Sequence, residues 1–101
     1  MISNHGKPKK TFQKKEDIVS RDIAGETILV PIRGKLADMQ RILALNPVAE
    51  YIWEHVNGEL TLDDIRLGIM KKFDVGEDQA KEDLYEFIDE LLMADLIEGV
   101  K

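Results

Sequence analysis

The dipeptide Asn46-Pro47 limits the possible folds of this chain more than any other feature, because the hydrophobic pattern changes there. Before it, apolar and β-branched residues occur in short runs; after it, apolar residues recur every three or four positions. Asn is favoured as a helix N-cap and Pro at the first helical position, so a helix is predicted to begin here. Strands followed by helices are typical of an α+β domain.

The first half predicts a hairpin and a further strand. Residues 17–33 are rich in β-branched residues and are interrupted by a turn at 24–26. Pro31 has no backbone N–H, so the second strand is expected to lie at a sheet edge or to end there. After a turn at 33–35, a third short strand is predicted near Gln40–Leu45.

The second half predicts three helices. The first ends about Val56, before Asn57-Gly58; the second opens at Thr61, a capping residue; the third spans roughly Glu77 to Ala94. Gly68 inside the second helix predicts close packing against a neighbour. The three apolar faces are Ala49, Ile52, Trp53 and Val56; Leu62, Ile65, Ile69 and Phe73; and Ala80, Leu84, Phe87, Ile88, Leu91 and Leu92. Leu96-Ile97 adds a short strand or packs onto the core. The predicted fold is α+β and winged-helix-like, with an N-terminal three-stranded antiparallel β portion followed by a three-helix bundle.

Length and charge define one domain with a basic N-terminal segment. A chain of 101 residues fits one small domain. Five of its fourteen basic residues fall within residues 1–15, which contain no acid and few apolar residues. Residues 1–15 are therefore predicted to be a disordered tail and residues 16–101 the single domain.

Several classes of function are disfavoured. The chain has no cysteine, so disulfides, thiolate metal sites and cysteine nucleophiles are excluded. His5 and His55 lack metal-ligand spacing, and the glycines are isolated turn residues rather than a phosphate loop. We expect no catalytic residues, metal or cofactor, and hence no enzyme. The sequence shows neither an apolar span of about 20 residues nor a signal segment, so we expect a cytoplasmic protein and no membrane partner.

Nucleic-acid binding is disfavoured by charge, although the predicted fold class includes DNA-binding proteins. The formal net charge is -6, and residues 77–98 contain nine acids against Lys81 alone. Such a helix would be repelled by phosphates. A winged-helix DNA-binding domain and a scaffold or dimerisation module that uses an exposed strand edge remain the alternative functions, and the oligomeric state stays open.

Several short motifs resemble a known family. They are Leu45-Asn46-Pro47, Ile52-Trp53-Glu54, Gly58, Thr61 and Ile65, followed by Asp83-Leu84, Phe87-Ile88, Leu91 and Leu96. Over about residues 17–99 the chain resembles the coenzyme PQQ synthesis protein D family. It departs from the family at Asp95, where Gly is frequent, and in a longer segment at residues 34–39.

The resemblance implies a peptide-recognition element and not an enzyme. Family members have a winged-helix-like fold, hold the leader of a ribosomally made precursor peptide, and present it to a modifying enzyme, often of the radical S-adenosylmethionine type. The leader adds as a strand beside the third strand and places apolar side chains against the third helix. The resemblance leaves open whether the pathway makes PQQ or another modified peptide.

The residues provide a candidate groove for this binding mode. Strand addition needs a free edge, which Gln40–Leu45 is predicted to supply. The predicted peptide-binding residues are Arg41, Ile42 and Leu43 on the strand and Asp83, Leu84, Phe87, Glu90 and Leu91 on the helix. Most of the apolar helix positions are also expected to be core, as is Trp53. Binding in the micromolar range is expected.

Overall fold

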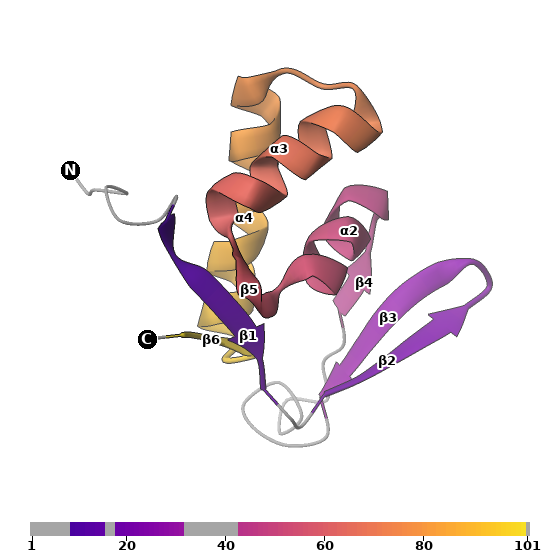
Figure 1. Ribbon diagram of the computed structural model, residues 1–101. Helices are drawn as coiled ribbons and strands as arrows, with labels where there is room; N and C mark the ends of the chain where they lie inside the picture. Colours follow the sequence, from indigo (N-terminus) through magenta and orange to yellow (C-terminus); the bar gives the residue numbers. More distant parts are fainter. Residues whose placement is uncertain (1–8, 16–17, 32–42, 101) are drawn as a thin grey trace.

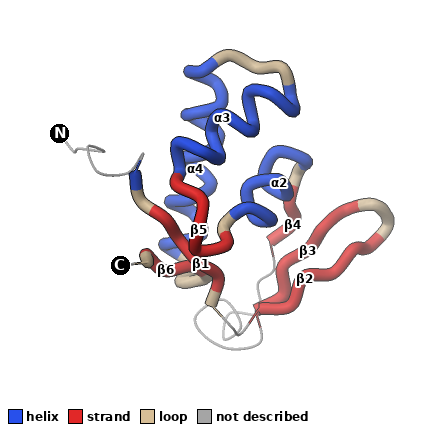
Figure 2. The backbone as a smooth tube through the Cα atoms, in the orientation of Figure 1, coloured by secondary structure: helices blue, strands red, loops and turns tan. Residues whose placement is uncertain are grey.

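A computed structural model describes residues 9–15, 18–31 and 43–100 of the chain. It contains two three-stranded antiparallel sheets and three helices, so the predicted α+β class is confirmed (Figure 1). The strands are β1 (Thr11–Lys14), β2 (Ile18–Ile23), β3 (Glu26–Pro31), β4 (Leu43–Leu45), β5 (Asn57–Thr61) and β6 (Ile97–Gly99), and the helices are α2 (Pro47–His55), α3 (Leu62–Phe73) and α4 (Glu77–Met93). Strands β1 to β4 all precede α2 along the chain, and the tube in Figure 2 can be followed through them from the N-terminus.

The sheet β2-β3-β4 contains the predicted hairpin. Strands β2 and β3 pair from Ile18↔Pro31 to Ile23↔Glu26, and the two turn residues Ala24 and Gly25 both have positive φ, 55° and 85°. A two-residue hairpin turn that matches the right-handed twist of its strands requires both residues to have positive φ. Strand β3 is the central strand of this sheet and ends at Pro31, so of the two predicted alternatives, an edge position or a strand end, the second is found. The turn predicted at 33–35 lies outside the described residues.

The N-terminal segment is ordered further than the sequence predicted. Strand β1 is the middle strand of the sheet β5-β1-β6, and Phe12 is buried in the core. The prediction of a disordered tail through residue 15 is therefore wrong for Thr11–Lys14. One buried aromatic ring is enough to place this lysine-rich segment in the sheet, because the methylene stem of a lysine covers apolar surface while its ammonium group stays hydrated. Residues 1–8 lie outside the described part.

Lys14 shows how a lysine is accommodated in this sheet. Its Nζ lies 5.0 Å from the centroid of the Trp53 ring and donates a hydrogen bond to the Val56 carbonyl oxygen at 3.3 Å. Partial burial lowers the pKa of Lys14 below its ordinary value, although the charge of Glu54 acts in the opposite direction. The cation therefore lies over the C-terminal end of α2, where helix carbonyls favour positive charge.

Helices α2 and α3 begin at the predicted caps, and α4 begins at Glu77 as predicted, after Gly76, which makes no side-chain cap hydrogen bond. The Asn46 side chain accepts a hydrogen bond from the Ala49 N–H at 2.8 Å, and Pro47 is the first residue of α2. Thr61 and Asp64 exchange backbone and side-chain hydrogen bonds in a capping box at the start of α3. The buried core is almost entirely aliphatic and includes Leu29, Ile52, Val56, Leu62, Ile65, Ile69, Leu84, Ile88 and Leu91, each at most 2% exposed.

Gly68 has the close-packing role predicted for it. A Cβ at this position would lie 2.9 Å from Cζ of Tyr51 and would overlap the Tyr51 hydroxyl oxygen. A glycine therefore lets α3 approach α2 at the phenol ring, which offsets the helix-propensity cost of glycine.

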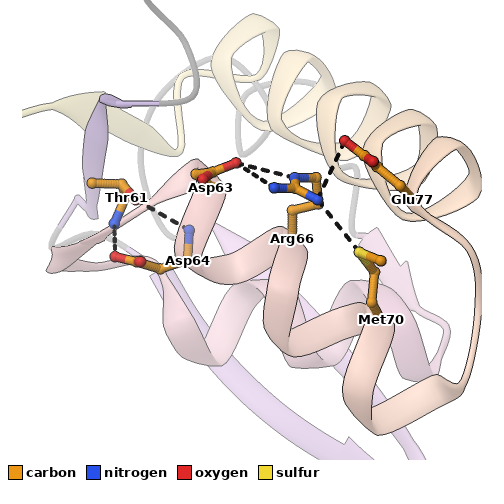
Figure 3. A network of polar contacts seen from close by, with 6 residues as sticks. All are labelled: Thr61, Asp63, Asp64, Arg66, Met70 and Glu77. Atoms are coloured by element: carbon orange, nitrogen blue, oxygen red, sulfur yellow. Dashed lines mark hydrogen bonds and ion pairs between the residues drawn. The ribbon is translucent and has the colours of Figure 1, made fainter.

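A polar network fixes α3 against α4 (Figure 3). The Arg66 guanidinium donates to Asp63 at 2.7 Å and to the Met70 sulfur at 3.4 Å, and it lies 3.6 Å from a Glu77 carboxylate oxygen. The hydrogen bonds to Asp63 raise the pKa of Arg66 above its ordinary value. Because Glu77 is the first residue of α4, this cation joins the beginning of α4 to α3.

Strands β5 and β6 lie on either side of β1 in the sheet β5-β1-β6. Of these two strands, only β6 was among the predicted possibilities. The predicted helix end about Val56 is confirmed, because α2 ends at His55 with Val56 as its C-cap. The strand β5 that begins at Asn57 was not predicted, and Gly58 in it has a φ of 83°. Asp95, just before β6, has a φ of 63°, which explains why Gly suits this position in related chains. None of the helices in the described segments is long and apolar enough to cross a membrane.

Candidate functional site

Strand β4 presents one free edge. It pairs with β3 through Leu43↔Leu29, Ala44↔Ile28 and Leu45↔Thr27, and no strand among residues 9–15, 18–31 and 43–100 pairs with its other edge. Leu45 is buried, Leu43 is half-buried, and Ala44 is exposed. The strand is thus held from one side and can accept hydrogen bonds from another backbone on the other.

A cleft of about 330 Å³ lies between the β4–α2 corner and α4. The first wall consists of Ala44, Asn46, Val48, Ala49 and Ile52, and the second of Asp83, Glu86, Phe87 and Glu90. This volume is at the lower end of small-molecule sites, and an open cleft of that size accommodates a few side chains of a longer ligand.

The first wall is built by the start of α2. The Asn46 cap fixes the first turn, so that Val48 and Ala49 line the cleft beside β4. A hydrogen bond from the Thr27 hydroxyl to the Glu50 carboxylate ties β3 to the same helix turn. The wall therefore rests on the sheet as well as on its own helix.

The second wall combines one aromatic ring with a row of acids. Phe87 is largely buried at 8% exposure but reaches the cleft, while Glu86 and Glu90 on either side of it are exposed. Asp83, one turn earlier, accepts a hydrogen bond from Gln79 at 2.9 Å. An apolar floor with a polar rim beside a strand edge suits an extended peptide, whose backbone pairs with β4 and whose alternate side chains enter the cleft.

His55, the one histidine in the described residues, does not line the cleft. His55 is engaged elsewhere, because it stacks on Tyr51 and contacts the Tyr51 carbonyl oxygen at 2.7 Å. Within the described segments, no three His, Asp or Glu side chains group together so as to hold a metal ion.

The predicted site residues have different locations. Asp83, Phe87 and Glu90 line the cleft, and Leu43 lies on β4 next to it, half-buried against the core. Leu84 and Leu91 are fully buried and do not line the cleft, so the structure corrects their predicted place in the groove. They belong to the centre of a wide apolar stripe, which the other elements of the core cover. Arg41 and Ile42 lie outside the described residues.

Sequence reasoning missed the wall made by α2. It placed the groove between a strand and the last helix, whereas Asn46, Val48, Ala49 and Ile52 form one side of the cleft. The signal was available in Asn46-Pro47, since a helix that begins directly after an edge strand must carry its first turn along the end of that strand. Ala44 and Glu86 were also missed.

Comparisons with known proteins agree with this architecture. Residues 26–97 match the family described as coenzyme PQQ synthesis protein D (PqqD). Among solved structures, the chain is similar to one titled "TbiB1 in Complex with the TbiA(beta) Leader Peptide", with a TM-score of 0.70 and 21% sequence identity, over 88% of this chain and 98% of that one. At this identity the likeness shows a shared fold. A comparison with curated proteins gives no match.

Proposed function

This chain belongs to the coenzyme PQQ synthesis protein D family, and on that premise we propose that it is a non-catalytic peptide-binding protein. It holds the leader of a ribosomally made precursor peptide and presents that peptide to a modifying enzyme. The observation that carries the proposal is the cleft between β4 and α4, which opens beside the free edge of β4.

The binding mode follows from the chemistry of that edge. A leader segment in extended conformation pairs its backbone with β4 as an additional strand, and alternate side chains then enter the cleft toward Val48 and Phe87. The similarity to TbiB1, which was solved in complex with a leader peptide, supports the same use of this fold.

Binding is expected to be moderate. One added strand is a small interface, and two or three apolar anchors, each contributing roughly 1.5–3 kcal/mol on full burial, must offset the ordering of a flexible peptide. A dissociation constant in the micromolar range follows. Contacts between the peptide and the enzyme then add to the affinity of the assembled complex.

The enzyme partner is proposed from the family alone. The family resemblance implies a modifying enzyme that is often of the radical S-adenosylmethionine type, so we propose such an enzyme as the partner, in PQQ synthesis or in another peptide-modification pathway. The cytoplasm, where precursor peptides are made, is the proposed location. The acidic surface of α4 favours this function over DNA binding through the same helix.

Isothermal titration calorimetry with the leader of the precursor peptide encoded beside this gene tests the proposal. We expect micromolar binding to the wild-type protein and at least tenfold weaker binding to Val48→Arg, whose side chain fills the cleft. Leu67→Arg is the matched control, because Leu67 is 52% exposed on α3 and does not line the cleft. Absence of heat at high micromolar peptide, or equal binding by both variants, would overturn the proposal.

A further inference from the structure

The α4 wall of the cleft carries three carboxylates on one face of the helix. Asp83, Glu86 and Glu90 are separated by three and four residues, and all three line the cleft. Asp83 accepts a hydrogen bond from the neutral Gln79. No lysine or arginine in the part of the chain that the structure describes forms an ion pair with any of the three.

Three acids elsewhere in the described residues do have cationic partners. Asp63 and Glu77 both face Arg66, and Asp95 binds Lys15 at 2.6 Å. The cleft is therefore a place where negative charge is concentrated beside an apolar surface without compensation from the described residues. The carboxylates do not group as metal ligands, so the arrangement suits a row of charges and not a single ion.

We propose that the peptide held in this cleft carries lysine or arginine two positions away from the apolar residue that contacts Phe87. This inference rests on the proposed function. In an extended peptide, side chains on one side recur about every 6.7 Å, whereas the helix rises about 6 Å over four residues and about 4.5 Å over three. An apolar side chain on Phe87 thus brings a basic residue two positions along level with Glu90 or Asp83.

The charges determine selectivity more than strength. Ion pairs at a hydrated rim contribute modestly to affinity and are screened by salt. The carboxylates nevertheless repel acidic peptides and speed the association of basic ones. Neutralising all three carboxylates is therefore expected to weaken a basic peptide about fivefold and to flatten the salt dependence of its binding.

Selection from a random 12-residue peptide library displayed on phage tests the inference without knowledge of the natural leader. Peptides selected on the wild-type protein are synthesised and titrated against three variants. The first is Val48→Arg, which identifies the peptides that occupy the cleft. The second is the triple variant Asp83→Asn, Glu86→Gln, Glu90→Gln. The third, Glu59→Gln, Asp78→Asn, Glu82→Gln, removes three exposed carboxylates that do not line the cleft. Circular dichroism verifies that each variant is folded.

The outcomes separate the two proposals. The inference is supported if the cleft-dependent peptides are enriched in basic residues at the two-position spacing. Their affinity must also be about fivefold weaker for the second variant and unchanged for the third. Cleft-dependent peptides without this enrichment, or with equal affinity for the second and third variants, overturn the inference and leave the proposed function standing. If no selected peptide loses binding in Val48→Arg, both proposals fail.

Discussion

At the scale of single residues, backbone conformation bears on Asp95, one of the two places where the sequence departs from the family pattern. The position before Leu96 is frequently Gly in related chains, and here it is Asp95 with a left-handed φ of 63°. Asp tolerates this region better than most residues, and its carboxylate also binds Lys15. The hydrogen bond from Lys15 to Asp95 raises the pKa of that lysine.

A pair of substitutions isolates this backbone effect. Asp95→Gly and Asp95→Ala both remove the carboxylate, but only Ala is strained at positive φ, so Asp95→Ala is expected to have a free energy of unfolding about 1 kcal/mol lower than Asp95→Gly. Urea denaturation of the two variants at one pH measures the difference. Equal stabilities would show that this residue does not hold a left-handed conformation in solution.

At the scale of elements, β1 extends the folded domain to the N-terminal side of residue 16, where the sequence predicted the domain to begin. It lies between β5 and β6, and its ring at Phe12 is 6% exposed. Phe12→Ala is expected to lower the free energy of unfolding by about 3 kcal/mol, because a buried aromatic side chain is lost and a cavity remains. Chemical denaturation gives the value.

The control for that substitution is on the same strand. Gln13 is exposed, and Gln13→Ala is expected to change the free energy of unfolding by no more than about 0.5 kcal/mol. If both variants were equally stable, Phe12 would not be part of the core and the segment would behave as the tail that its lysines suggest.

The elements also show which features local sequence determines. Helices α2 and α3 were predicted at the right starts, because Asn46 and Thr61 cap through hydrogen bonds to residues three positions away. The β2–β3 hairpin was predicted for the same reason, since its turn is local. Strands β1 and β5 were missed because each is short and is stabilised by a partner distant in the sequence.

The cleft was predicted only in part, because it depends on tertiary placement. The helical periodicity of the sequence identified Phe87 and its acidic neighbours. Periodicity does not show which positions on a wide apolar stripe are covered by other elements, as Leu84 is, and which stay accessible. It also gave no indication that the first turn of α2 would face α4.

At the scale of the whole molecule, the two sheets have different roles. The sheet β5-β1-β6 has the N-terminal strand β1 at its centre, whereas the sheet β2-β3-β4 has β4 at one edge (Figure 1). Ala44 of β4 lines the cleft. The Arg66 network joins the first residue of α4 to α3 (Figure 3). The molecule thereby presents a strand edge and a helix wall to an extended ligand.

Intermolecular nuclear Overhauser effects test this account most directly. With ¹⁵N,¹³C-labelled protein and the unlabelled leader peptide, we expect contacts between backbone protons of the peptide and those of Leu43–Leu45, together with contacts from peptide side chains to Val48 and Phe87. Binding that leaves β4 unperturbed and places the peptide on the β2 edge or on the sheet β5-β1-β6 would contradict the account.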